Sequence, residues 1–384
     1  MDPQALIKRH SSKFGKAPET TVFAPGRVNF IGEHTDYNGG LVMPLALDMG
    51  VYAAASRNTL GLLRIHSLDF RKYGEFDLKS LKPEKKETWA NCPMGMVQMM
   101  IEAGRKVSGL DLTMTGNLPM GAGLSSSAAA EVAAGFAVKE LFHIKLEGIR
   151  LALLGQKAEH EFTGAKCGIM DQAISVLGRK DSLLKLSCRD LSYDYIPFKP
   201  KGLKLLIVNS GVRHNLAQGE YNIRRKECAD AFHIAQKIKP GIECLSDFTL
   251  DLLEENRIRF PGKIYARCHH VLSENARVKS AAARLARDDF ASVGQLMFES
   301  HESLRRDYEV SCEELDWLVD RAKAQKGVLG ARMTGGGFGG CVIALVEEKA
   351  EESFRESLKG YKKEFKKAPQ IYEAIASDGA RTIA

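Results

Sequence analysis

GNLPMGAGLSSSAAAEV, residues 116–132, places a glycine-rich loop directly before a run of alanines. Glycine lets a backbone approach a ligand closely and alanine is the strongest helix former, so the stretch predicts a loop that leads into a helix. The N-terminus of a helix carries unpartnered N–H groups and partial positive charge, which suit an anion. An ordinary loop with Ser125, Ser126 or Ser127 as the helix cap fits these residues equally well. The choice between an anion-binding loop and an ordinary helix cap therefore depends on the rest of the sequence.

The loop does not carry the motifs of the two most familiar nucleotide-binding folds. No lysine follows Gly123, as a Walker P-loop requires, and the strand-first G-x-G-x-x-G context of a dinucleotide fold is missing. Backbone N–H groups and serine hydroxyls could still hold a nucleotide phosphate, with Mg²⁺ bound by a hydroxyl and a carboxylate.

Composition indicates a two-domain globular protein. The chain has 384 residues, of which 44% are hydrophobic and 27% are charged. No stretch approaches the roughly 18 consecutive apolar residues that a membrane span needs, and the start, MDPQALIKRHSSKFGK, lacks the apolar core of a signal peptide. The net charge of +7 is spread along the chain. It could favour an anionic ligand but does not by itself predict nucleic-acid binding.

Eight cysteines without C-x-x-C pairs are typical of reduced thiols, so we expect a cytoplasmic protein. Cys268-His269-His270 resembles a metal site at first sight. Adjacent side chains on one element point in different directions, however, and no second pair lies at zinc-ligand spacing. The triplet predicts a helix face with one buried cysteine.

The pattern along the chain predicts an α+β protein in two lobes. In residues 21–47, Pro25, Gly26 and the Gly39-Gly40 pair interrupt apolar segments, which predicts strands joined by turns. Apolar residues every four positions predict a helix after the loop, and LEGIRLALLGQKAEHEF (146–162) predicts another that ends near Gly164. LKLLIVNS (203–210) predicts a buried strand, with a domain boundary near FKPKG just before it. Helices follow from Tyr221, and ARMTGGGFGGCVIALV (331–346) predicts a glycine-rich turn that leads into a strand, with a helix and a strand after it.

Two further stretches carry residues suited to chemistry. PGRVNFIGEHTDYNGG (25–40) gathers Glu33, His34 and Asp36, the types of side chain that recognise sugar hydroxyls; a surface turn is the alternative. In EHEFTGAKCGIMDQAIS (159–175), Asp171 and Glu159 flank a glycine-containing turn. They could serve as general base and metal ligand, or as a first-turn helix acid and a solvated glutamate.

Four segments resemble the motifs of the GHMP kinases: residues 25–40, 116–132, 159–175 and RMTGGGFGG (332–340). Within the first of them, GRVNFIGEHTDYNGG resembles the galactokinase signature. CGIMDQ, NSGVRHNLAQGEYNIRRKEC, ESHESLRRDYEVSCEELD and GARMTGGGFGGC are also similar to galactokinases, in the same order. The resemblance covers nearly the whole chain, and it favours the phosphate-binding interpretation of the opening loop.

The resemblance implies the α+β two-domain GHMP kinase fold. An N-terminal ribosomal-S5-domain-2-like lobe (1–200) would carry the signature, the loop and Asp171. A C-terminal ferredoxin-like lobe (201–384) would carry the late glycine motif, and the last strand could return to the first lobe. The implied activity is ATP- and Mg²⁺-dependent phosphorylation of the C1 hydroxyl of D-galactose, the first phosphorylation step of the Leloir pathway. We expect a monomer without a protein, nucleic-acid or membrane partner.

The resemblance also assigns roles to residues. Asp171 and Arg27 match the catalytic pair, and the residues that match sugar-contacting positions are Glu33, His34, Thr35, Asp36, Gly168 and Tyr221. The ATP site would comprise Gly121, Ala122, Gly123, Leu124, Ser125, Ser126 and Ser127, with Ser67 and Trp89 lining the nucleotide pocket. Ser127 and Glu159 match the Mg²⁺ ligands.

Chemistry agrees with these roles, since phosphoryl transfer requires mainly positioning and charge neutralisation. Arg27 would keep Asp171 ionised, and the glycines of 335–340 would pack against the phosphate loop. The chain departs from the family pattern at two positions. Alanine at Ala122 should be tolerated in the phosphate loop if its φ is negative. Phe30 replaces a commoner aliphatic residue and should alter only the packing around it. Two alternatives are a galactokinase-like sensor of sugar and ATP, disfavoured by the complete serine loop, and a kinase for a related sugar such as N-acetylgalactosamine or arabinose.

Overall fold

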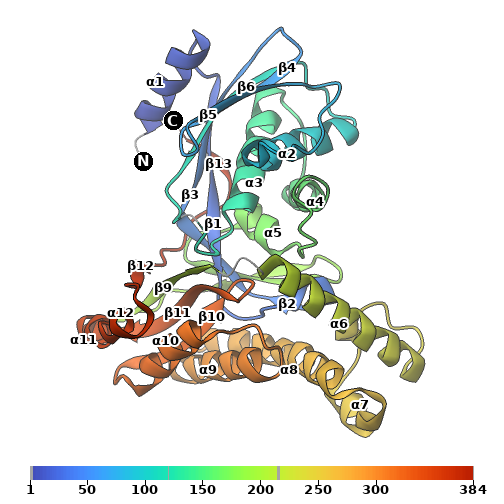
Figure 1. The fold of residues 1–384 in the computed structure, drawn as a ribbon, viewed down its shortest axis with the longest axis vertical. Coiled ribbons are helices and arrows are strands. Elements are labelled where there is room, and N and C mark those ends of the chain that lie inside the picture. Colours follow the sequence, from blue (N-terminus) through green and yellow to red (C-terminus); the bar gives the residue numbers. More distant parts are fainter. Residues whose placement is uncertain (1–2, 120, 214–216, 384) are drawn as a thin grey trace.

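A six-stranded sheet is the scaffold of the upper half of the molecule (Figure 1). This computed structural model describes residues 3–119, 121–213 and 217–383. In spatial order the strands are β13 (Arg381–Thr382), β1 (Thr20–Asn29), β3 (Pro44–Arg57), β6 (Leu110–Gly116), β4 (Leu62–Ser67) and β5 (Lys72–Asp77). The β4–β6 pair is parallel and the other pairs are antiparallel.

Strand β1 does not break where the sequence predicted. It runs through Pro25 and Gly26 as one strand of ten residues, so the predicted interruption at these two residues is wrong. Its pairing with β3 instead shifts register between Pro25 and Arg27. A bulge of this kind accommodates a proline, which has no N–H for the ladder, and redirects the side chains that follow.

Helices cover both faces of this sheet (Figure 1). On one side lie α2 (Asn91–Glu102), α3 (Ser126–Leu141), α4 (Gly148–Ala158) and α5 (Met170–Leu177), and on the other lies α1 (Pro3–Phe14). The predicted helix after the glycine-rich loop is α3, and its buried alanines allow it to lie close to β1 and β3. The second predicted helix is also confirmed: α4 continues into a π-helical turn, η3 (Glu159–Thr163), and ends at Gly164 in the left-handed region.

A four-stranded antiparallel sheet lies at the centre of the lower half, in the order β10 (Val328–Thr334), β11 (Gly339–Glu347), β9 (Leu203–Arg213) and β12 (Gln370–Glu373). Alternate residues of β9 enter two different hydrophobic clusters: Leu205 and Ile207 one, Leu206 and Val208 the other. Both faces of the sheet are therefore buried. The helices of this half are α6 (Ala217–Ile238), α7 (Leu250–Glu255), α8 (Gly262–Leu285), α9 (Phe290–Arg306), α10 (Glu313–Ala324), α11 (Glu351–Ser357) and α12 (Gly360–Phe365).

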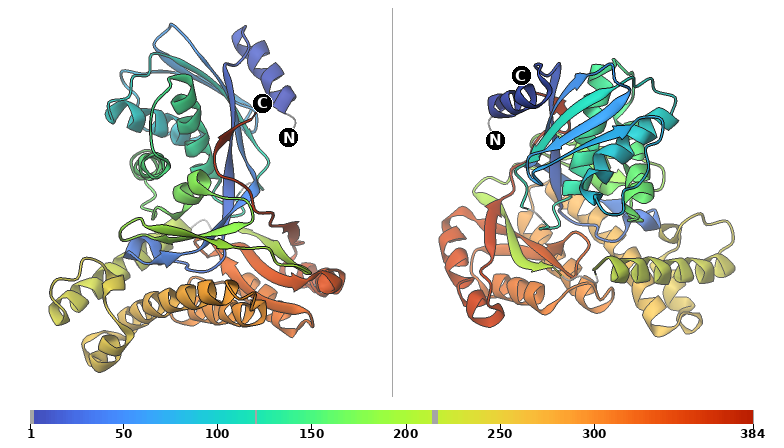
Figure 2. Two further views of the ribbon diagram at one scale, coloured as in Figure 1. Left: turned by 180° about the vertical axis from the view of Figure 1, so that it is seen from behind. Right: turned by 45° about the horizontal axis from the view of Figure 1, so that its top comes forward.

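The chain crosses between the two halves more than once. A small sheet, β2 (Leu41–Val42), β7 (Ser182–Ser187) and β8 (Tyr193–Pro197), lies between them, and after β12 the chain returns so that β13 pairs with β1 (Figure 2). This pairing confirms the predicted return of the last strand. The division into residues 1–200 and 201–384 stays a prediction, with β13 as the segment that crosses it. Short 3-10 turns complete the fold: η1 (Asp36–Asn38), η2 (Thr88–Ala90), η4 (Leu245–Asp247), η5 (Arg257–Arg259) and η6 (Glu348–Ala350).

The Cys268-His269-His270 triplet lies on α8, as predicted, but His270 is buried as fully as Cys268. The described residues contain no group of three or more His, Cys, Asp or Glu side chains that could hold a metal ion. Within those same residues, no helix combines the length and apolar character needed to cross a bilayer.

Candidate active site

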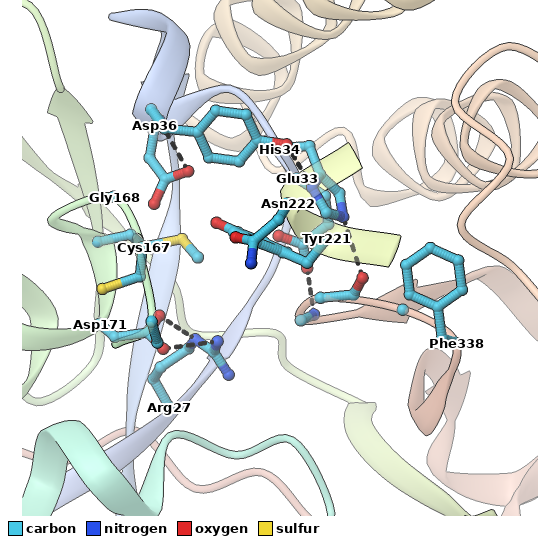
Figure 3. Close-up of a pocket in the computed structure, with 16 residues that line it drawn as sticks. Arg27, Glu33, His34, Asp36, Cys167, Gly168, Asp171, Tyr221, Asn222 and Phe338 are labelled. Carbon is cyan, nitrogen blue, oxygen red and sulfur yellow. Dashed lines mark hydrogen bonds and ion pairs between the residues drawn. The ribbon is translucent and has the colours of Figure 1, made fainter. Parts of the chain in front are cut away.

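Two cavities contain most of the side chains that the sequence singled out. The first, of about 260 Å³, lies where the two halves of the molecule face each other (Figure 3). The second, of about 780 Å³, lies between the sheet and α2. Residues from distant parts of the sequence line the first cavity: Arg27, Glu33, His34, Asp36, Tyr37, Ala165, Cys167, Gly168, Met170, Asp171, Tyr221, Asn222 and Gly335 to Phe338.

An ion pair between Arg27 and Asp171 forms one side of the first cavity (Figure 3). Arg27 Nε donates to Asp171 Oδ1 at 2.8 Å, and Nη2 donates to Oδ2 at 3.0 Å. Burial lowers the pKa of Arg27, but the carboxylates of Asp171, Glu33 and Asp36 together outweigh this effect and raise it. The bidentate pair therefore holds a full positive charge against a carboxylate whose side chain remains 25% exposed.

Ser125 connects this ion pair to α3. It occupies the N-cap position of the helix, as one interpretation of the sequence predicted, but its side chain makes no capping bond. Its φ of 61° places it in the left-handed region, and its hydroxyl donates to Asp171 Oδ2. Unusual backbone geometry of this kind persists only where the surroundings enforce it, and it is frequent at functional sites.

Glu33, His34 and Asp36, from the later part of the segment 25–40, line another part of the first cavity. Glu33 is buried and accepts the N–H of Gly335 at 2.6 Å and the side-chain amide of Asn29, while Arg332 lies 3.5 Å away. Burial raises the pKa of Glu33 although Arg332 opposes this shift. The pKa of Asp36 is raised to about 7, first by burial and then by the nearby charge of Asp171. His34 is buried as well, which lowers its pKa to about 3.

Thr35 differs from its neighbours because it does not line the cavity. It is fully buried, and its hydroxyl lies 2.9 Å from the carbonyl of Gly32 and 2.7 Å from that of Leu41. The side chain thereby holds the turn that presents Glu33, His34 and Asp36. A direct contact between Thr35 and a ligand stays a prediction.

Gly168 shapes the first cavity because it has no side chain. A Cβ at this position would lie 2.0 Å from Oδ2 of Asp36 and 2.1 Å from its Cγ, far inside van der Waals contact. Glycine therefore allows the Asp36 carboxylate to lie against the backbone of the loop before α5. Tyr221, on α6, closes the cavity with its ring 5.6 Å from that of His34 and 5.4 Å from that of Tyr37.

Residues 121–125 of the glycine-rich loop line neither cavity, so their predicted contact with ATP stays a prediction. Gly121 and Gly123 have φ values of 68° and 74°, whereas Ala122 is not among the residues with positive φ, so the expected tolerance of alanine there is confirmed. The carbonyl of Gly123 accepts Arg27 Nη1 at 2.7 Å, and that of Leu124 accepts the Arg27 N–H at 3.1 Å.

The predicted packing of the late glycine run against this loop is also confirmed. A Cβ at Gly335 would lie 3.2 Å from the carbonyl oxygen of Gly123, and one at Gly340 would lie 3.3 Å from that of Ala122. Next to the run, Cys341 Sγ lies 3.0 Å from the same Ala122 oxygen.

Ser126, Ser127, Ser67 and Trp89 all line the second cavity, so the structure brings these predicted residues together. Ser127 Oγ donates to Glu159 Oε1 at 2.8 Å. Burial, and then the charge of Asp171, raise the pKa of Glu159. Among the described residues no cationic side chain pairs with this carboxylate.

Four residues at the site were not singled out from the sequence, although two of them lie inside motifs that were. Gln172 follows Asp171 directly, and its Nε2 donates to Glu159 Oε2 at 2.6 Å and to Glu131 Oε2 at 3.0 Å. Arg332 begins the late glycine motif and contacts Glu33. Lys72 and Lys86 line the second cavity from a less distinctive region. Proximity to a recognised motif is the signal that could have identified the first two.

Models of three protein families match the chain. The galactokinase galactose-binding signature matches residues 8–57, the GHMP kinases N terminal domain matches residues 91–179, and the GHMP kinases C terminal domain matches residues 281–364. The signature model contains Arg27 and the residues Glu33, His34 and Asp36, and the N-terminal model contains the glycine-rich loop and Asp171.

Similar proteins cover almost the whole chain. A galactokinase of Chloroflexus aggregans is 46% identical over 91% of this chain and 89% of its own length. A galactokinase of Roseiflexus is 41% identical over 100% of this chain and 98% of its own. The structure of Lactococcus lactis galactokinase complexed with galactose superposes with a TM-score of 0.96 at 33% identity, covering 99% of this chain and 100% of that one. A mevalonate kinase of Methanococcus jannaschii, with a TM-score of 0.68 at 20% identity, shares the fold.

Proposed function

The chain belongs to the galactokinase family of the GHMP kinases, and from this premise we propose that it transfers the γ-phosphoryl group of ATP to the C1 hydroxyl of D-galactose. As a member of this family it is an ATP-dependent sugar kinase. The observation that carries the proposal is the Arg27–Asp171 pair, which lines the first cavity while Ser125 joins it to the serines of the second. An acceptor hydroxyl and a phosphate donor can meet there.

Asp171 acts on the acceptor hydroxyl. Its carboxylate takes the proton of the C1 hydroxyl as that oxygen bonds to the γ-phosphorus, and the bond from the γ-phosphorus to the β–γ bridging oxygen breaks to release ADP. Arg27 orients the Asp171 carboxylate through two hydrogen bonds and offsets negative charge on the transferred group. A loose transition state needs little deprotonation in advance, so orientation of the hydroxyl is as much the role of Asp171 as proton transfer.

The ATP phosphates are received by the glycine-rich loop and the start of α3. The N–H groups of the first helical turn are directed outward with partial positive charge, and Ser126 adds a hydroxyl donor. The base and ribose lie in the second cavity, beside Trp89 and Ser67.

Ser127 and Glu159 fit a magnesium ion. They offer a hydroxyl and a carboxylate oxygen 2.8 Å apart, and hard oxygen ligands are the ones Mg²⁺ prefers. Glu159 is 8% exposed and, within the described residues, has only neutral hydrogen-bond partners, so a cation there would compensate its buried charge. When bound, Mg²⁺ neutralises charge on the β- and γ-phosphates.

Galactose is recognised in the first cavity by Glu33, His34, Asp36 and Tyr221, with Gly168 allowing Asp36 its position. Fixed donors and acceptors at fixed angles discriminate sugar epimers, because a mismatched hydroxyl leaves a buried polar group unpaired. We include in the proposal that the protein is a monomer and that it is cytoplasmic; the eight unpaired cysteines support the second point.

The test is phosphorylation of galactose, glucose, N-acetylgalactosamine and arabinose with ATP and Mg²⁺, with the position of the phosphate determined by NMR. Galactose 1-phosphate as the main product supports the proposal. Preference for another sugar would assign the site to a related kinase. Binding of ATP and galactose without turnover would indicate a sensor.

A further inference from the structure

Behind His34, a row of hydrogen-bonding side chains leads away from the first cavity. His34 Nδ1 lies 2.8 Å from the hydroxyl of Tyr37, which lies 2.8 Å from the hydroxyl of Tyr308, which in turn lies 2.9 Å from Cys228 Sγ. Tyr308 and Cys228 are at most 1% exposed. The row therefore joins residues 34–37 to the residues after α9 and to α6. Tyr37 is partly exposed and lines the first cavity, whereas the far end of the row, at Tyr308 and Cys228, is closed to water.

The direction of every bond in this row follows from its inner end. His34 Nε2 lies 3.2 Å from the carbonyl oxygen of Gly336, which can only accept, so Nε2 carries the proton (Figure 3). In a neutral imidazole Nδ1 then accepts, and the Tyr37 hydroxyl must donate to it. Having donated its proton, the Tyr37 oxygen accepts from Tyr308, and the Tyr308 oxygen accepts from the Cys228 thiol.

The surroundings keep His34 neutral. The ring is 5% exposed, and burial, followed by His270, Arg224 and Arg332, lowers its pKa to about 3. His270 is also buried and makes its own bonds, to Ser303 Oγ at 2.9 Å and to the carbonyl of Glu33 at 3.1 Å.

We propose that Tyr37 and Tyr308 are positioning residues that, together with the Gly336 carbonyl, hold His34 as the Nε2-protonated tautomer, so that the first cavity presents one neutral donor to a hydroxyl oxygen of the sugar. This inference rests on the proposed function for the identity of the sugar, but not for the tautomer itself. Without sugar the donor is paired with Gly336. The bound sugar oxygen takes the place of that carbonyl or shares the proton with it.

The fixed tautomer contributes to specificity. An imidazole free to exchange tautomers could either donate to or accept from the same hydroxyl, and it would distinguish sugar stereoisomers less well. The tyrosines remove that freedom before the sugar arrives, which lowers the ordering cost of binding.

The first measurement is ¹⁵N NMR of the histidine-labelled full chain, with His34 assigned by His34→Gln. We expect a protonated Nε2 and an unprotonated Nδ1 at pH 7. Tyr37→Phe should populate the Nδ1-protonated form and raise KM for galactose about fivefold, the value of one neutral hydrogen bond, with kcat within about twofold of wild type. Tyr308→Phe should change the His34 tautomer and KM for galactose in the same direction but by less, because the Tyr37 hydroxyl can still donate to His34.

Tyr361→Phe is the matched control. Tyr361 is fully buried in the same half of the molecule and donates one hydrogen bond, to the Ser210 carbonyl at 2.9 Å, far from His34. Its loss should leave both the His34 tautomer and KM for galactose unchanged.

Deoxygalactoses separate positioning from a general structural effect. For the 2-, 3-, 4- or 6-deoxy sugar that lacks the oxygen contacted by His34, Tyr37→Phe should no longer raise KM, while for the others the fivefold increase should persist. A wild-type His34 protonated at Nδ1, an unchanged tautomer and KM in Tyr37→Phe, or an equal increase for every deoxy sugar would each overturn the inference. If wild type phosphorylates no sugar, the proposed function fails and the donor role fails with it, whereas the NMR result still decides the tautomer.

Discussion

Replacing Gly168 with alanine tests how the first cavity holds its sugar. The added Cβ would lie 2.0 Å from Asp36 Oδ2, while ordinary contact begins at 3.4 Å, a shortfall of about 1.4 Å. Asp36 cannot retreat freely, because its carboxylate accepts the Tyr37 N–H at 2.9 Å. Displacement of a binding group by about 1 Å costs roughly 100-fold, so we expect Gly168→Ala to raise KM for galactose by about that factor, or about 2.7 kcal/mol.

The assay is steady-state kinetics in both substrates, with galactose binding measured by calorimetry. KM for ATP should stay near its wild-type value, because the second cavity does not include Gly168. Gly262→Ala is the control: it lies at the start of α8, nothing is within 4 Å of its would-be Cβ, and the added methyl has room. A folded Gly168→Ala variant that binds galactose within twofold of wild type would refute the reasoning, since the predicted collision would then have no effect on the site.

Three further predictions concern the carboxylates. Asp171→Asn should lower kcat by about 10³-fold while galactose affinity changes only severalfold, because the amide keeps the shape of the site but cannot take the proton; near-normal turnover would be incompatible with its assigned role. Glu159→Gln should raise the Mg²⁺ concentration needed for ATP binding by about tenfold, and calorimetric titrations at several Mg²⁺ concentrations that match wild type would contradict the metal assignment. The native pKa of Asp36 is about 7 against an ordinary 3.8, so the native state binds this proton more tightly than the unfolded state does and wild-type stability falls as pH rises between these values. Asp36→Asn should therefore raise the melting temperature relative to wild type at pH 8 but not near pH 4, and an equal shift at both pH values would count against it.

Much of the site could be predicted because its residues lie in a few contiguous motifs. The glycine-rich loop and α3 follow from local preference: positive φ is easily adopted by Gly121 and Gly123, and alanines favour the helix that follows. The buried strand β9 and the end of the second helix at Gly164 follow from the same kind of local pattern.

Other features depended on residues far apart in the chain. Pro25 predicted a break, yet β1 continues through it, because pairing with β3 accommodates the proline by a shift in register. Ser125 predicted a helix cap, but its hydroxyl bonds to Asp171, 46 residues away. Local preference could not foresee either outcome, since tertiary contacts override it where they contribute more free energy.

By itself, the sequence determined the family, the phosphate-binding loop and the types of side chain available for chemistry, because these reside in short segments whose order along the chain is distinctive. Only the tertiary structure decided how those side chains are charged and directed. Arg27 and Asp171 pair across 144 residues, and the pKa of Asp36 rises to about 7 because folding buries it beside Asp171. His34 is a neutral donor because burial lowers its pKa and because Tyr37 and Gly336, the latter 302 residues away, favour the proton on Nε2. Protonation and hydrogen-bond direction depend on burial and on neighbours, and folding determines both.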